Sequence, residues 1–342
     1  MLPSPTPVRE WHNVGRECFE SDIAPLFQPA VLRGFVEHWP AVREGLRSND
    51  ALFNYLKGYA TQQPVRLFLG APEIHGRYFY TEDMRGFNFE ELEGPFAAAL
   101  GQFQGLIGAP DAPSIYMGAT SIPSVLPGFE KDNHLEVIGD EVLPNIWIGG
   151  AATITTHFDT SDNIACALAG KRRFTLFPPE QISNLYIGPL DHTPAGQPVS
   201  MVSVSNPDLS RYPRFAQALE QAQVAELAPG DALYIPPLWW HNVDSFAPLN
   251  VLVNYWWEPL TATTGSPFDS LIHSILAVSH LPLKQRQAWR AFFDHYVFGE
   301  AAPAEHLAPE HRGILGELTP EVAEEIKTYL KHGLQAGLPP EK

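Results

Sequence analysis

Two histidines and one aspartate in this sequence have the spacing of a metal site. His157 and Asp159 are two positions apart, so in a β-strand, where side chains alternate between faces, both point to the same side. His241 can supply a third ligand from a later strand. Two imidazoles and one carboxylate on one side of an ion form the facial triad of non-haem Fe(II) oxygenases, which leaves positions open for substrate and dioxygen. Such a His-x-Asp pair also occurs in strands that bind no metal, so the surrounding elements must decide.

Short strands separated by Gly and Pro turns surround these residues. The segment Asn163–Gly170 is typical of a buried strand that ends in a glycine turn, and Arg173–Phe177 of the returning strand, stopped by two prolines. Later, the segment Ala228–Val243 contains a Pro-Gly turn, a short strand and His241, and Pro248–Glu258 adds another apolar strand. Strands of this length and spacing predict a β-sandwich or barrel.

Composition indicates an acidic intracellular protein. The 342 residues include 22 Lys and Arg against 39 Asp and Glu, a formal charge of −17. An acidic chain repels phosphate backbones and anionic membrane surfaces, so we expect neither nucleic acid nor membrane as a partner. Cys18 and Cys166 are too few for a disulfide framework, and the first residues lack the basic and apolar regions of a signal peptide. We therefore expect a cytoplasmic location.

The order of elements predicts three regions. Residues 1–134 are expected to form a mixed α/β N-terminal lobe, residues 135–258 the β-sandwich core, and residues 259–342 a helical C-terminal region. Within the core, the stretch 185–226 contains little strand pattern. A loop of this length is typically a lid or a binding loop, although a passive surface excursion remains open from sequence alone.

Two local signals predict helices in the N-terminal lobe. Ser48, or the residue after it, is expected to cap a helix that runs to Lys57 and ends at a glycine. Asn88, with a glutamate three positions later, resembles a capping box, and predicts a helix that continues to Leu100. A Gly-Pro pair interrupts this second pattern.

The C-terminal region has helical periodicity. Pro267 and Pro320 each follow a Ser or Thr, a combination typical of helix starts. Apolar residues recur there at helical spacing on two helices: Leu271 and Ile275 on one, and Val322, Ile326 and Leu330 on the other. Such stripes usually pack within their own chain.

Together these segments resemble the JmjC and cupin-like Fe(II)/2-oxoglutarate-dependent oxygenases, in particular the branch of the factor-inhibiting-HIF asparaginyl hydroxylase. The matching residues are His157-Phe158-Asp159, Asn163, Gly170–Gln181, Asn206-Pro207-Asp208, Arg211–Phe215, Pro229-Gly230-Asp231, Tyr234-Ile235-Pro236, Trp239-Trp240-His241 and Asn254. Weaker similarity extends over most of the chain. The resemblance implies a mainly β fold with helical extensions, built on a double-stranded β-helix (jelly-roll) core.

The resemblance also implies a function. We expect a hydroxylase that uses Fe(II), 2-oxoglutarate and O2, releases succinate and CO2, and acts on a protein side chain or a small molecule. Its iron ligands would be His157, Asp159 and His241. In the family, helices after the sandwich form a homodimer interface, so the C-terminal helices are expected to make this chain a homodimer.

Four further residues match cosubstrate positions of the family: Tyr116, Asn163, Arg172 and Asn254. Two departures stand out. Arg172 occupies the position where relatives usually have the Lys that holds the far carboxylate of 2-oxoglutarate. Ile154 replaces a threonine that contacts the cosubstrate in the asparaginyl hydroxylase.

Strand alternation indicates which way Arg172 points. It shares a face with Phe174 and Leu176, which must lie inside the sandwich, so its guanidinium is expected to be buried. A buried guanidinium requires an anion. The candidates are a bound dicarboxylate, which could be held by the planar fork of Arg, or an Asp or Glu of the protein itself.

Two other functions fit the same pattern. One is a cupin metalloenzyme that does not use 2-oxoglutarate, such as an isomerase, which would keep the triad and tolerate Arg172 and Ile154. The other is a non-catalytic cupin that binds a metal or ligand. The intact triad argues against the latter, because a binding protein does not require an open-sided iron site.

Overall fold

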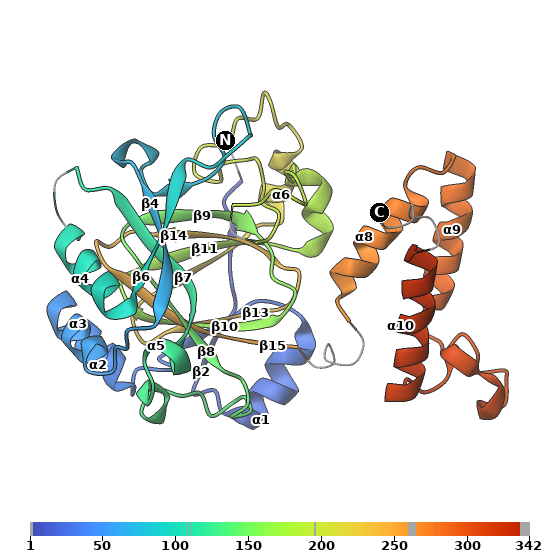
Figure 1. The fold of residues 1–342 in the computed structure, drawn as a ribbon, viewed down its shortest axis with the longest axis horizontal. Helices are drawn as coiled ribbons and strands as arrows, with labels where there is room; N and C mark the ends of the chain where they lie inside the picture. The colour runs from blue at the N-terminus through green and yellow to red at the C-terminus, as the bar shows by residue number, and fades with distance from the viewer. Residues whose placement is uncertain (1–2, 108, 110, 195, 259–264, 336–342) are drawn as a thin grey trace, which may run out of the picture. The chain divides into compact units, whose positions relative to one another are not determined.

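The computed structural model describes residues 3–107, 109, 111–194, 196–258 and 265–335. Contacts divide the chain into two units, Met1–Trp257 and Glu258–Lys342. The first unit contains two β-sheets and several helices (Figure 1), and the described residues of the second form helices but no strand.

The two sheets have six and nine strands. The first has the order β1 (Thr6–Pro7), β12 (Gln223–Leu227), β11 (Arg172–Phe177), β14 (Trp240–Ser245), β9 (Ala152–His157) and β5 (Arg77–Tyr78). The second has the order β2 (Glu10–His12), β3 (Ala30–Arg33), β13 (Ala232–Ile235), β10 (Asp162–Ala169), β15 (Asn250–Trp257), β8 (Pro144–Gly149), β7 (Ser114–Ser121), β4 (Pro64–Gly70) and β6 (Phe89–Pro95). Most neighbours are antiparallel, whereas β1, β2 and β5 each pair in parallel with their neighbour.

The last eight strands form the jelly-roll. Strands β9, β11, β12 and β14 lie side by side in the six-stranded sheet, and β8, β10, β13 and β15 lie side by side in the nine-stranded sheet. The chain crosses between the sheets repeatedly along this sequence, as it does in a double-stranded β-helix. The predicted fold, mainly β with helical extensions around a jelly-roll core, is confirmed.

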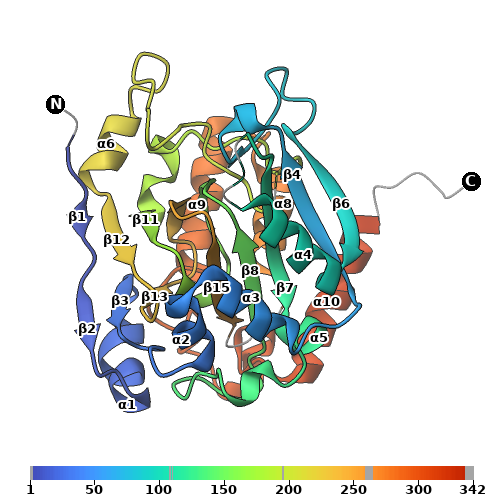
Figure 2. The same cartoon turned by 90° about the vertical axis from the view of Figure 1, so that its left-hand side faces the viewer.

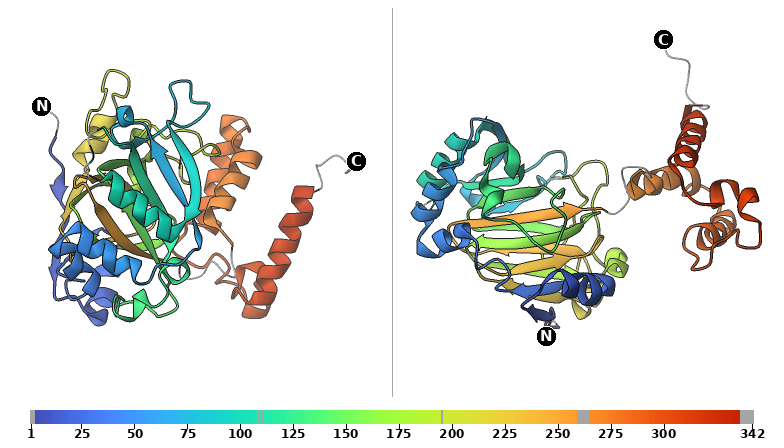
Figure 3. Two further views of the ribbon diagram at one scale, coloured as in Figure 1. Left: turned by 60° about the vertical axis from the view of Figure 1, so that its left-hand side comes forward. Right: turned by 90° about the horizontal axis from the view of Figure 1, so that it is seen from below.

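Strand β10 is buried on both faces because a core lies on each side of it. Ile164, Cys166 and Leu168 pack toward the helices, whereas Ala165 and Ala167 pack into the space between the sheets. The covering helices are α2 (Pro40–Arg47), α3 (Asn49–Lys57) and α4 (Phe96–Leu106), which lie along the outer side of the nine-stranded sheet (Figures 2 and 3). This arrangement leaves the inner faces of the two sheets to form a site.

One predicted helix start is confirmed and another is wrong. The Ser48 side chain accepts a hydrogen bond from the backbone N–H of Ala51 and caps α3. Asn88 caps no helix, because its side chain instead bonds the backbone of Arg77 and Phe79. The residues after it form β6, which pairs with β4 along its whole length, and α4 begins only after Pro95. The other α-helices in the described part of this unit are α1 (Arg16–Cys18), α5 (Ile122–Val125) and α6 (Phe215–Glu220), and short π or 3-10 turns connect further elements.

The strands within residues 1–134 belong to the same two sheets as the jelly-roll strands. These residues contribute β1 and β5 to the six-stranded sheet, and β2, β3, β4, β6 and β7 to the nine-stranded sheet. The N-terminal region therefore extends both sheets of the jelly-roll.

The second unit consists of three longer helices and short turns. These helices are α8 (Pro267–Val278), capped by the Ser266 side chain, α9 (Leu283–Tyr296) and α10 (Pro320–Gln335). Many of their large apolar side chains are exposed, including Leu271, Ile275 and Leu330. Within the described ranges, no helix has both the length and the apolar character needed to cross a membrane.

Candidate metal centre and the adjoining cavities

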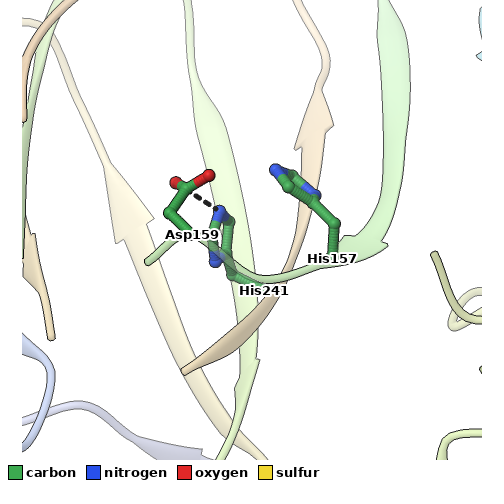
Figure 4. Close-up of side chains that lie close together, drawn as sticks. All are labelled: His157, Asp159 and His241. Atoms are coloured by element: carbon green, nitrogen blue, oxygen red, sulfur yellow. Dashed lines mark ion pairs between the residues drawn. The ribbon is translucent and has the colours of Figure 1, made fainter. Parts of the chain in front are cut away.

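The three predicted metal ligands lie together inside the jelly-roll. His157 ends β9, Asp159 follows two residues later, and His241 on β14 is paired directly with His157 across the sheet. The ligand atoms of the three side chains all lie within 4.8 Å of one another, and Nε2 of His241 is 3.6 Å from Oδ2 of Asp159 (Figure 4). Two imidazoles and a carboxylate at this separation form the donor set of a facial triad.

Backbone carbonyl groups fix the tautomers of both histidines. Nδ1 of His157 is 2.9 Å from the carbonyl oxygen of Thr155, and Nδ1 of His241 is 3.0 Å from that of Trp239. A carbonyl oxygen only accepts hydrogen bonds, so each Nδ1 carries the hydrogen and each Nε2 has its lone pair free. Burial, together with the nearby His157, lowers the pKa of His241 to about 4 despite the opposing charge of Asp159. His241 is therefore a neutral ligand at physiological pH.

A backbone hydrogen bond joins the loop that carries Asp159 to the loop that precedes β14 and His241. The N–H of Leu238 donates to the carbonyl oxygen of Asp159 at 2.8 Å. Leu238 has a φ of 64°, in the left-handed region that side chains other than glycine rarely adopt. Backbone strain of this kind persists where the surrounding structure holds it in place, and is frequent at functional sites.

A β-bulge on β9 changes which side chains face the metal site. His157 pairs with His241, and Ile154 pairs with Val243. Two residues that are three positions apart on β9 thus pair with two that are only two positions apart on β14. Regular alternation would place Ile154 and His157 on opposite faces, because they are an odd number of positions apart. With the extra residue, both line the same interior space.

All seven predicted site residues line one small cavity between the sheets. It contains the triad, Tyr116, Asn163, Arg172 and Asn254, with walls that include Trp147, Phe174 and Trp256. The structure thus brings together residues from β7, β9, β10, β11, β14 and β15, and from the loop after β9. What each of them binds remains a prediction.

Arg172 is buried in this cavity without an acidic partner. Only 5% of the residue is exposed, and its Nε has no hydrogen-bond partner. In the part of the chain that the structure describes, no carboxylate lies within 4.0 Å of its guanidinium, whereas the neighbouring Arg173 points outward and binds Glu226. Burial lowers the pKa of Arg172 to about 10, which keeps the side chain charged at neutral pH. The sequence left two candidate anions for Arg172, a bound dicarboxylate and an Asp or Glu of the protein. Among the described residues no Asp or Glu takes this place.

The two asparagines are held by their neighbours. Oδ1 of Asn254 accepts a hydrogen bond from Nε1 of Trp147 at 2.6 Å, and Nδ2 of Asn254 donates to Oδ1 of Asn163 at 3.1 Å. Tyr116 stands beside them, and burial raises the pKa of its hydroxyl group well above the ordinary value, with the charge of Arg172 opposing this. The hydrogen bonds orient the two amides, and burial keeps the Tyr116 hydroxyl protonated.

A larger cavity of about 700 Å³ opens beside the triad. It shares with the small cavity the residues Tyr116, Trp147, Ile154, His157, Asp159 and Trp256. Phe68, Tyr78 and Phe89 add further aromatic wall, and Thr193, Pro194, Gly196 and Gln197 border it from the long insertion. Of the two interpretations of that insertion, the structure supports a loop that helps to form a binding site.

Sequence reasoning missed several of these lining residues. Trp256 is two positions after Asn254 on β15, so strand alternation could have placed it on the same face. Tyr78 and Thr155 had no comparable signal. The side-chain polar atoms of all three, Nε1 of Trp256, the hydroxyl of Tyr78 and Oγ1 of Thr155, are buried without a hydrogen-bond partner.

A double-stranded β-helix that holds two histidines and a carboxylate around an open-sided site defines a protein of the cupin and JmjC oxygenase class. Residues 16–263 match the model of the Cupin-like domain family. The chain belongs to this family.

Three curated relatives show the range of proteins that it resembles. It is 27% identical over 251 residues to Jumonji C domain-containing protein 5 of Drosophila melanogaster, covering 71% of this chain and 56% of the relative. It is 26% identical over 267 residues to Lysine-specific demethylase 8 of Xenopus tropicalis, covering 75% and 54%. Human tRNA wybutosine-synthesizing protein 5 is 37% identical over 115 residues, which are 34% of this chain and 33% of the relative. The chain thus spans about half the length of the first two relatives, and membership of the asparaginyl hydroxylase branch stays a prediction.

Proposed function

We propose that this protein is an Fe(II)- and 2-oxoglutarate-dependent oxygenase that hydroxylates a protein side chain or a small molecule. The position of Arg172 is the observation that carries the proposal. A buried guanidinium with no acidic partner among the described residues lines the same cavity as an open-sided triad. Leaving such a cation unpaired is unfavourable by several kcal/mol. A dicarboxylate bound at the triad through one end would present its far carboxylate to Arg172.

The donor set fits iron, and the cavity fits the cosubstrate. His157, Asp159 and His241 would hold Fe(II), with both Nε2 atoms already oriented by backbone carbonyls. Arg172 and Tyr116 would hold the far carboxylate of 2-oxoglutarate. When bound, the iron and 2-oxoglutarate supply the activation of O2 for oxidation of a C–H bond, with release of succinate and CO2.

The protein itself would supply orientation and a water-poor site. Trp147, Phe174 and Trp256 line the small cavity with aromatic surface, which limits the access of water to the metal. The larger cavity, which adjoins the triad, would hold the substrate. Because the chain has a formal charge of −17, repulsion of phosphates favours a protein or small-molecule substrate over RNA.

Succinate formation tests this function. We expect the purified protein, incubated with Fe(II), ascorbate and 2-oxoglutarate under air, to produce succinate, and omission of Fe(II) to abolish it. A protein that binds iron but does not consume 2-oxoglutarate would instead be a cupin metalloenzyme of another type. A protein without any metal-dependent turnover would be a binding cupin.

We also propose that the C-terminal helices form a homodimer interface. The stripes Leu271/Ile275 and Val322/Ile326/Leu330 lie on α8 and α10, where Leu271, Ile275 and Leu330 are 49%, 37% and 44% exposed. Large apolar side chains that are exposed in a row along a helix are typical of protein–protein interfaces.

We predict that the full-length chain is a dimer at micromolar concentration, and that a chain ending near Glu258 is a monomer. Introducing charges with Leu271→Glu and Ile275→Glu should separate the dimer, because burying carboxylates in an apolar interface is strongly unfavourable. Light scattering would measure the three masses. A monomeric full-length protein would rule out the interface.

A further inference from the structure

Tyr78 is one of three cavity residues, with Thr155 and Trp256, whose buried polar atom has no hydrogen-bond partner and no role in the proposed function. Tyr78 is only 7% exposed, and its hydroxyl group has no hydrogen-bond partner. A buried polar group without a partner costs about 1–3 kcal/mol, so such groups are rare unless a ligand or water satisfies them. Tyr78 lines the larger cavity together with His157, Asp159 and Tyr116.

Strand pairing places Tyr78 next to a residue that lines both cavities. The two-residue strand β5 pairs in parallel with β9, and Tyr78 is in register with Ile154. Side chains of paired residues project from the same face of a sheet, and Ile154 lines both cavities. The Ile154 side chain cannot form a hydrogen bond with a polar ligand, so of these two paired side chains only Tyr78 can do so.

Aromatic neighbours hold the Tyr78 ring in place. Its centroid is 5.7 Å from that of Tyr116, 5.5 Å from that of Phe89 and 6.5 Å from that of Phe68. Tyr116 in turn lies close enough to Arg172 for the guanidinium to lower the pKa of its hydroxyl, against the larger effect of burial. Tyr116 therefore links the two cavities, because it lines the larger one together with Tyr78 and the small one together with Arg172. Burial also raises the pKa of Tyr78, so its hydroxyl stays protonated and can donate.

We propose that the Tyr78 hydroxyl donates a hydrogen bond to the far carboxylate of 2-oxoglutarate, as a third positioning group beside Arg172 and Tyr116. A carboxylate offers about four lone-pair sites, more than a guanidinium and one phenol occupy. This inference rests on the proposed function, because it requires that the cavity binds 2-oxoglutarate.

Two keto acids distinguish the far carboxylate from the rest of the ligand. 2-Oxoglutarate and 2-oxobutyrate share the carboxylate and keto group that chelate a metal, but 2-oxobutyrate lacks the far carboxylate. Each would be titrated into the full-length, Fe(II)-loaded protein under nitrogen, following the metal-to-ligand absorption band. We expect Tyr78→Phe to weaken 2-oxoglutarate binding by about 10- to 100-fold, as for a hydrogen bond to a charged group. The affinity for 2-oxobutyrate should be unchanged.

Tyr80→Phe is a matched control. The Tyr80 hydroxyl donates to the carbonyl oxygen of His192 at 2.6 Å and does not line either cavity. Without ligand, Tyr78→Phe should unfold at a temperature no lower than wild type, because it removes no protein hydrogen bond, whereas Tyr80→Phe should unfold at a lower temperature. With 2-oxoglutarate, Tyr80→Phe should bind as tightly as wild type.

The outcomes separate this inference from the proposed function. If wild type binds both keto acids, and Tyr78→Phe binds each of them with the same affinity as wild type does, the Tyr78 assignment is wrong. Equal weakening of both keto acids would also overturn it, because the effect would then lie at the metal. If wild type shows no preference for 2-oxoglutarate over 2-oxobutyrate, the proposed cosubstrate itself fails.

Discussion

His241→Ala should abolish stoichiometric Fe(II) binding and leave a folded protein, and His157→Ala and Asp159→Ala should do the same. Three protein ligands make up the whole triad in the described residues, so each removal leaves only two, too few to hold a divalent ion against water. Succinate formation should fall to background with the metal. Iron content after desalting and circular dichroism would measure the two effects separately.

His280→Ala serves as the control for this series. His280 is exposed on the second unit and belongs to no group of metal-binding residues in the described chain. Its replacement should leave iron content unchanged. Full iron content in His241→Ala would contradict the assignment of the triad.

Arg172→Ala should weaken 2-oxoglutarate binding by two or more orders of magnitude. Removing one partner of a buried charge pair costs about 3–5 kcal/mol, which corresponds to more than 100-fold in the dissociation constant. Arg172→Lys should recover part of the affinity, because an ammonium group restores the charge without the bidentate fork. Anaerobic titration of the Fe(II)-loaded protein, following the metal-to-ligand absorption band, would measure all three proteins.

The adjacent arginine provides a matched control. Arg173 is on the same strand but faces outward and binds Glu226, so Arg173→Ala should not change the affinity. Arg172→Ala should also lose most of the preference for 2-oxoglutarate over 2-oxobutyrate, because the only cationic anchor proposed for the far carboxylate is gone. Equal affinity in wild type and Arg172→Ala would make Arg172 a structural residue.

The sequence was sufficient to predict local structure where strand alternation or a short-range helix cap determines it. Arg172 could be placed inside because β11 keeps the two-residue alternation that also buries Phe174 and Leu176. Ser48 could be recognised as a cap because its side chain bonds a backbone group only three residues away. The regular strands and turns predicted a β-sandwich or barrel, and the resemblance to the JmjC and cupin-like oxygenases specified the jelly-roll.

The sequence was insufficient where distant segments decide the local structure. The capping pattern at Asn88 was overridden because the following residues gain a full set of pairs with β4. Only the family resemblance placed Ile154 at the site, because strand alternation would have turned it away from His157 and the bulge on β9 breaks that alternation. The sequence pattern around Tyr78 is strand-like, but it does not reveal that this short strand pairs in parallel with β9.

The hydrogen bonds that orient the two metal-binding imidazoles have a consequence for mutational tolerance. Each imidazole is held by the carbonyl oxygen two residues before it, at Thr155 and Trp239. Main-chain oxygens are retained whatever side chain occupies these positions, so no single substitution there deletes the acceptor. Proteins that orient their ligands with an outer carboxylate side chain can lose that carboxylate by one mutation. In this protein the main chain fixes the tautomers of both histidines. The side chains at positions 155 and 239 can therefore change without loss of these hydrogen bonds, as long as β9 and β14 keep their register.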